Sequence, residues 1–152
     1  MLLLTFQVDG QQYAIDAKSV VEVIPQVKLR PLPGTAAFVG GVFNYRGTLV
    51  PVIDVTRMLS GRRTQEQLSA RIILVSYPEG GENVHTLGLL TEKSTEIVER
   101  DKGTFADTGI ENQTTPWLGK IAVDGKSMIQ FVRIENLLPD ELKNTLFKQR
   151  SP

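Results

Sequence analysis

Few side chains in this 152-residue sequence could carry out covalent or metal chemistry. His85 is the sole histidine, cysteine is absent, and the carboxylates are scattered rather than clustered. Nucleophilic catalysis needs a nucleophile beside a base, and a zinc site needs several His or Cys ligands. No glycine-rich run followed by Lys and Ser or Thr precedes a helical pattern, so a phosphate cradle is missing as well. The sequence therefore predicts a non-enzymatic protein without a metal or other cofactor.

The charge balance argues against a nucleic-acid partner. Lys plus Arg and Asp plus Glu number 17 each, so there is no excess of cations to neutralise phosphates. The absence of cysteine fits a reducing cytoplasm. The apolar segment 1–6 has no basic flank and no cleavage site, and Asp9 follows it, so we expect a first strand rather than a signal peptide or membrane span.

Short alternating runs separated by turn residues predict a mainly β fold built from hairpins. The paired strands are expected over 5–9 with 12–16, 41–45 with 48–55, 71–77 with 84–90, and 119–123 with 127–132. A further strand is expected over 27–30, and short helices over 17–22 and 54–59. Pro139 at a first helical position and the leucine spacing around it predict a C-terminal helix over 139–150.

The chain also resembles itself at two offsets. Residues 13–24 align with 87–98 at a shift of 74, and 40–47 align with 118–125 at a shift of 78. The polar segment 60–70 lies between the two halves and is the expected subdomain boundary. We therefore predict two small five-stranded β-barrels packed about a pseudo-twofold axis, with a seam between them where a partner could bind.

The run from Gly40 to Asp54 resembles a segment of the CheW family, Gly-Val-x-Asn-x-Arg-Gly-x-x-x-Pro-Val-x-Asp. The resemblance covers roughly 3–138, and it implies a single CheW-like domain over 1–152 made of two SH3-like barrels. It also implies a cytoplasmic adaptor, recruited to membrane-associated receptor arrays. Its partners would be the cytoplasmic tip of a methyl-accepting chemotaxis receptor and the regulatory domain of a CheA-type histidine kinase.

Two departures from the family pattern leave the identity of the partners open. Thr91 and Glu92 stand where the family has an Asp, and Gln130 interrupts an apolar strand. A CheW-like scaffold of a non-flagellar pathway, serving pili, biofilm or a second messenger, fits as well as one for motility. An SH3-like barrel that binds peptides or nucleic acid is the third alternative, and the aromatic platform it needs is not visible in the sequence.

The candidate partner-binding residues follow from the motif and from the repeat. Arg46 at a turn could pair with a carboxylate of a partner, although a solvated turn residue is the plainer alternative. Glu22 could contact the receptor, or it could simply face solvent. Gly41 and Gly88 could allow a close approach, or they could mark strand bulges. The full set comprises Val20, Glu22, Val23, Gly41, Asn44, Arg46, Gly88, Ile97 and Val98.

Overall fold

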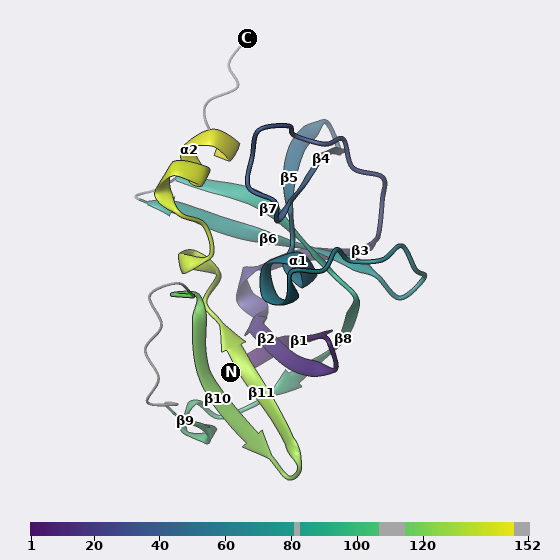
Figure 1. Cartoon of the computed structure of the whole chain (residues 1–152). Coiled ribbons are helices and arrows are strands. Elements are labelled where there is room, and N and C mark those ends of the chain that lie inside the picture. Colours follow the sequence, from purple (N-terminus) through teal and green to yellow (C-terminus); the bar gives the residue numbers. More distant parts are fainter. Residues whose placement is uncertain (81–82, 107–114, 148–152) are drawn as a thin grey trace.

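The computed structural model describes residues 1–80, 83–106 and 115–147, which form strands and a few short helices (Figure 1). The strands are β1 Leu2–Val8, β2 Gln11–Asp16, β3 Val20–Pro25, β4 Val39–Tyr45, β5 Thr48–Asp54, β6 Arg71–Gly80, β7 Asn83–Thr91, β8 Lys93–Glu99, β9 Phe105–Ala106, β10 Leu118–Asp124 and β11 Ser127–Val132. The α-helices are α1 Val55–Ser60 and α2 Asp140–Phe147, and the 3-10 helices are η1 Ala17–Ser19, η2 Lys102–Thr104 and η3 Ile134–Asn136.

The strands form two sheets of similar design. The six-stranded sheet has the order β8-β1-β2-β11-β10-β9, and the five-stranded sheet has the order β3-β6-β7-β5-β4. The first five strands of the six-stranded sheet correspond, position by position, to the strands of the five-stranded sheet. In these positions β8 corresponds to β3, β1 to β6, β2 to β7, β11 to β5 and β10 to β4. The β2–β11 and β7–β5 pairs are parallel, and the other pairs are antiparallel. The expected mainly β fold with two matching halves is confirmed, and β9 adds the sixth strand.

The strand register supports the repeat at a shift of 74. Val23 on β3 lies opposite Ile73 on β6, while Ile97, its counterpart at that shift, lies opposite Leu4 on β1. A register irregularity interrupts both strand pairs next to this position. Duplication of one structural unit would produce the same strand pairing, with the same irregularity, in both sheets.

The two hairpin turns match less closely than the shift of 78 predicts. Arg46 and Gly47 form the first turn, and Gly125 with Lys126 forms the second, so a shift of 79 brings the turns together. Gly47 is thus the second residue of its turn and Gly125 the first, each with positive φ. Different turn types place glycine at different positions, which explains the offset of one.

The segment 60–70 does not separate the two sheets, so the expected barrel boundary there is wrong. It joins α1, which follows β5, to β6, and both strands belong to the five-stranded sheet. Each sheet contains strands from both halves of the chain, because β3 pairs with β6 and β8 pairs with β1. A sequence repeat shows where one copy ends, but it does not show which copy supplies a strand's neighbours.

Three local expectations also change. Only Ala17–Ser19 is helical in the expected helix 17–22, because the β-branched residues from Val20 onward pair as β3 with β6. The expected strand 27–30 is reduced to a bridge between Arg30 and Val42, with backbone N···O distances of 2.8 and 2.9 Å. The C-terminal helix runs from Asp140 to Phe147, and 148–150 lie outside the described residues.

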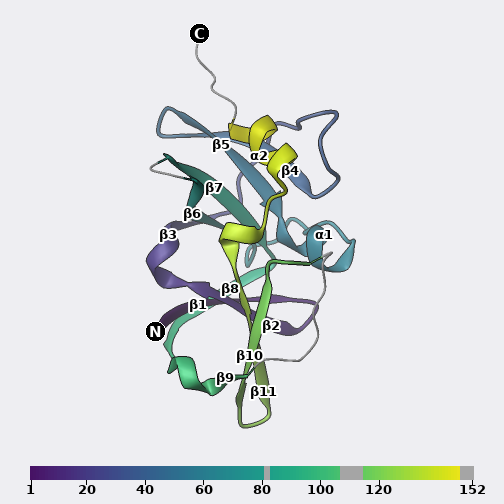
Figure 2. The ribbon, with the colours of Figure 1, turned by 90° about the vertical axis from the view of Figure 1, so that its left-hand side faces the viewer.

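Both sheets contribute side chains to one shared core. Leu4, Phe6 and Ile15 from the six-stranded sheet belong to the same buried cluster as Ile73 and Leu89 from the five-stranded sheet. Helix α2 covers one end of this core, and the β10–β11 turn lies at the other end of the molecule (Figure 2). In the described part of the chain, no helix is both long and apolar enough to cross a membrane.

Candidate partner-binding site

Glu22, Tyr45 and Arg46, hereafter the Glu22 cluster, join the two edge strands of the five-stranded sheet. The Tyr45 hydroxyl donates a hydrogen bond to the Glu22 carboxylate, and Arg46 Nη2 lies 3.4 Å from Glu22 Oε2. The Arg46 guanidinium carbon lies 5.0 Å from the centre of the Tyr45 ring, within cation–π range. The hydrogen bond to Glu22 raises the pKa of the Tyr45 hydroxyl, so Tyr45 holds its proton.

The turn holds Arg46 outward. Arg46 has a φ of 52° and is followed by Gly47 at 89°, and the side chain of Asn44 accepts a hydrogen bond of 2.7 Å from the Gly47 amide. Asn44 therefore shapes the turn within the chain. The Arg46 side chain remains 75% exposed, and one nitrogen of its guanidinium contacts Glu22. No described residue is bonded to its other guanidinium nitrogens, so these donors can bind a carboxylate of a partner.

Gly41 and Gly88 meet neighbours inside the chain. A Cβ on Gly41, whose φ is 138°, would lie 2.4 Å from the backbone oxygen of Arg30. A Cβ on Gly88 would lie 2.9 Å from Val52 Cγ2 and 3.0 Å from Ile72 Cγ2. Close packing inside the domain, against Arg30 for Gly41 and against β5 and β6 for Gly88, thus accounts for both glycines.

The four apolar candidates lie on β3 and β8, the equivalent edge strands of the two sheets. Val23 is 38% exposed and Ile97 is 61% exposed, whereas Val20 and Val98 are half-buried and pack on core clusters. Val21, which the sequence analysis left out of the candidate set, is 51% exposed and belongs with Val23. Val21 and Val23 flank Glu22, and residues two apart on a strand lie on the same face, which was the signal for it.

Comparison with models of protein families identifies the family of this chain. The model described as a CheW-like domain matches residues 2–142. The chain belongs to the CheW-like domain family. Its relatives include the chemotaxis protein CheW of Rhizobium meliloti (strain 1021), 26% identical over 142 residues that cover 91% of this chain and 88% of the relative. The chemotaxis protein CheW of Bacillus subtilis (strain 168) is 28% identical over 111 residues, 71% of each chain.

A solved structure supports the same assignment. The scaffolding protein TtCheW from Thermoanaerobacter tengcongensis matches this CheW-like domain with a TM-score of 0.77 and 26% sequence identity. The match covers 91% of this chain and 87% of that one. Both halves of the CheW-like fold are therefore present.

The last residue of the CheW-like motif, Asp54, has a structural role that the candidate list missed. Asp54 is 7% exposed, and its carboxylate accepts hydrogen bonds from the Arg57 amide at the start of α1 and from Thr64. Arg62 on the same loop forms ion pairs with Asp9 and Glu92. Glu92, one of the residues that depart from the family pattern, thus helps to hold the loop 60–70 against the rest of the CheW-like domain through its ion pair with Arg62.

The seam between the sheets contains a cavity of about 350 Å³. Residues of β2, η1, β6, β7, β11 and η3 line it, including Asp16, Ser76 and Glu135. None of the nine candidate residues lies in this lining. The candidates are instead on the edge strands and at the β4–β5 turn of the CheW-like domain.

Proposed function

We propose that this protein is a non-enzymatic cytoplasmic adaptor that couples the cytoplasmic tips of chemotaxis receptors to a CheA-type histidine kinase. The observation that carries the proposal is the motif residue Arg46, which Glu22 and the turn geometry hold in an exposed position. The names of the relatives, chemotaxis proteins, and of the matching structure, a scaffolding protein, support it. An adaptor of this kind works by binding at membrane-associated receptor arrays.

Two different surfaces suit two partners. The Glu22 cluster presents charged groups, which favour a partner with a matching carboxylate or cation. The edge strands present exposed apolar residues, among them Val21, Val23 and Ile97. An amphipathic helix buries its apolar face in such a surface, and a receptor tip made of helices would do so here. Glu22 and Arg46 act as one surface, because their side chains contact each other.

The test compares Arg46→Asn with Arg63→Asn in binding to the kinase regulatory domain and to the receptor tip, each measured alone by calorimetry. Asn tolerates the positive φ of Arg46, so the first variant removes the charge without straining the turn. Arg63 is an exposed arginine on the loop 60–70 and serves as the matched control. We expect Arg46→Asn to weaken binding to at least one partner by about tenfold or more, and Arg63→Asn to leave both affinities unchanged.

Ile97→Asp tests the apolar surface in the same assay. We expect a weaker affinity for the receptor tip, because a carboxylate on an apolar edge must be desolvated on binding. Wild-type affinities of Arg46→Asn for both partners would contradict the role of Arg46. If Arg46→Asn and Ile97→Asp both bind like the wild type, the two proposed surfaces are wrong, and if the wild-type chain binds neither partner, the proposed coupling function is wrong.

A further inference from the structure

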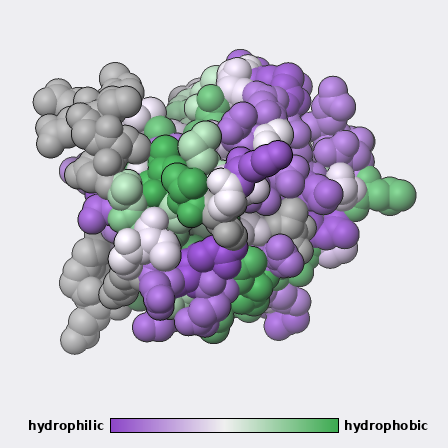
Figure 3. Space-filling view, turned by 90° about the horizontal axis from the view of Figure 1, so that it is seen from below, coloured by the Kyte–Doolittle hydropathy of each residue, from purple (hydrophilic) through white to green (hydrophobic). Residues whose placement is uncertain are grey.

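A cavity of about 250 Å³ lies at the end of the six-stranded sheet, outside the surfaces described above. It is lined by Met1, Phe105, Gly119, Lys120, Phe131 and Arg133. The β4–β5 turn, which includes Arg46 of the Glu22 cluster, is at one end of the molecule, and the β10–β11 turn is at the other (Figure 2). Figure 3 views the molecule from the end where β9, β10 and β11 lie, and shows hydrophobic groups between polar ones there.

Two aromatic rings form the apolar part of this cavity. Phe105 on β9 and Phe131 on β11 pack edge to face with their ring centres 6.0 Å apart, and both are half-buried. They rest on the buried cluster of Leu3, Ala14 and Ile129, which keeps the rings in place. Gly119 approaches closely here, because a Cβ on it would lie 3.0 Å from the Phe131 backbone oxygen. The shape of the cavity is thus set by β-sheet backbone and by packed rings.

The charged groups that line the cavity are cationic. Lys120 and Arg133 are exposed, and among the residues that the structure describes the lining contains no carboxylate side chain. Arg133 Nη2 donates hydrogen bonds to the backbone oxygens of Pro116 and Leu118, at 2.9 and 3.1 Å, which fixes the guanidinium beside the cavity. Backbone carbonyls do not cancel its charge, so the positive potential remains available to an anion.

We propose that this cavity binds a small carboxylate with an aromatic or branched apolar body. The apolar body packs against Phe105 and Phe131, and the carboxylate pairs with Lys120 and Arg133. The volume is slightly below the roughly 300 to 1,000 Å³ of sites for drug-sized ligands, so the ligand has about ten non-hydrogen atoms. Such a site would let the protein respond to a free small molecule in addition to its protein partners.

The test is a titration of phenylacetate into the isotope-labelled full chain, followed by amide chemical shifts. We expect saturable shifts around Phe105, Lys120 and Phe131, with a dissociation constant on the order of 1 mM for a ligand of this size. Phenylacetamide lacks the charge and acetate lacks the ring, so each should bind about tenfold more weakly or worse.

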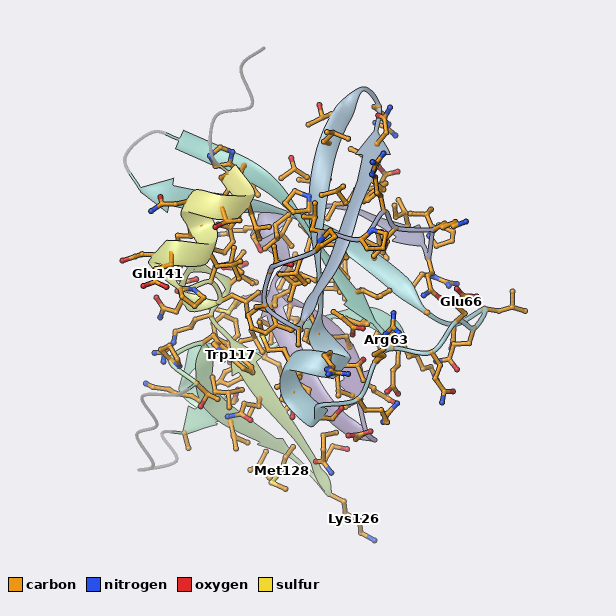
Figure 4. The ribbon with its side chains drawn as sticks, turned by 45° about the horizontal axis from the view of Figure 1, so that its top comes forward. Arg63, Glu66, Trp117, Lys126, Met128 and Glu141 are labelled. Atoms are coloured by element: carbon orange, nitrogen blue, oxygen red, sulfur yellow. The ribbon has the colours of Figure 1, made fainter. Side chains whose placement is uncertain are left out.

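Lys120→Glu should weaken phenylacetate binding by about tenfold or more. Lys126→Glu is the matched control, since Lys126 points into solvent at the β10–β11 turn (Figure 4) and should leave binding unchanged. Absence of saturable shifts up to about 10 mM would overturn the proposal. The proposal would also be overturned if phenylacetamide bound as tightly as phenylacetate, or if Lys126→Glu weakened phenylacetate binding as much as Lys120→Glu does. If Lys120→Glu does not fold, the comparison of the three ligands on the wild-type chain decides the question.

Discussion

Glu22 and Arg46 belong to opposite edges of one sheet, and yet Arg46 Nη2 lies 3.4 Å from Glu22 Oε2. Glu22 is on β3, the first strand in the order of the five-stranded sheet, and Arg46 follows β4, the last. A sheet whose edge strands meet through side chains must curl on itself. The contact that brings the two edges of the sheet together therefore also belongs to the surface that we propose for partner binding.

The ion pair should contribute little to stability. Its side chains are 75% and 36% exposed, and exposed pairs usually contribute about 0.2 to 1 kcal/mol. A double-mutant cycle with Arg46→Asn and Glu22→Gln, measured by urea unfolding, should give a coupling free energy in this range. The coupling should fall further at about 1 M salt. A coupling above about 2 kcal/mol would mean that the pair holds the fold together, and binding losses would then have an indirect cause.

The glycine candidates should affect stability rather than binding. Gly88→Ala forces a Cβ against Val52 and Ile72, which should cost about 1 to 3 kcal/mol of unfolding free energy. Gly41→Ala should cost more, because its φ is positive and the facing atom is a backbone oxygen. Gly103→Ala, with no atom within 4 Å of the added Cβ, should change stability by about 0.5 kcal/mol or less.

Chemical denaturation of the three glycine variants provides the measurement, and affinity for the kinase domain provides the contrast. Folded Gly88→Ala should bind with the wild-type affinity. If Gly88→Ala keeps the wild-type stability but loses affinity for the kinase domain, Gly88 belongs to the partner-binding surface.

The hairpins could be predicted from the sequence because their signals are local. Arg46-Gly47 between two apolar runs predicts the β4–β5 hairpin, and Glu22 and Arg46 were both recognised as candidates. Their contact could not be predicted, since it joins residues 24 positions apart on strands that are not sheet neighbours. The pairing of β3 with β6 was missed because residues 17–22, which include the start of β3, were expected to form a helix. Long-range pairing depends on how the two copies pack, and hydrophobic periodicity contains no information about that.

Tyr77 should make the protein less stable at alkaline pH. Burial raises the pKa of the Tyr77 hydroxyl above its usual value near 10, although the hydrogen bond from the Leu138 amide opposes this. The folded state therefore holds this proton more tightly than the unfolded state does. The stability gained is present below about pH 10 and is lost as the pH rises through the folded-state pKa.

Tyr77→Phe should remove this part of the alkaline loss, and at neutral pH it should cost about 1 to 2 kcal/mol because the buried Leu138 amide loses its acceptor. Tyr45→Phe is the comparison, since hydrogen bonding to Glu22, rather than burial, is the main cause that raises the pKa of the half-buried Tyr45 hydroxyl. Urea unfolding between about pH 8 and pH 11 measures both effects. An alkaline profile that is the same in Tyr77→Phe and in the wild type would contradict the prediction.

Cutting the chain within the loop 60–70 tests the exchange of strands between the sheets. A protease site placed between Gln65 and Glu66 interrupts no strand, but each sheet takes strands from both pieces. We expect the cut protein to remain one folded complex on gel filtration, with a melting temperature that rises with concentration because unfolding now separates two chains. Each piece alone should be unfolded, since β1 and β2 would lack β8 and β11, and β6 and β7 would lack β3 and β5. Two independently folding barrels would instead give a cooperative transition for a single piece, and that result would contradict the shared core.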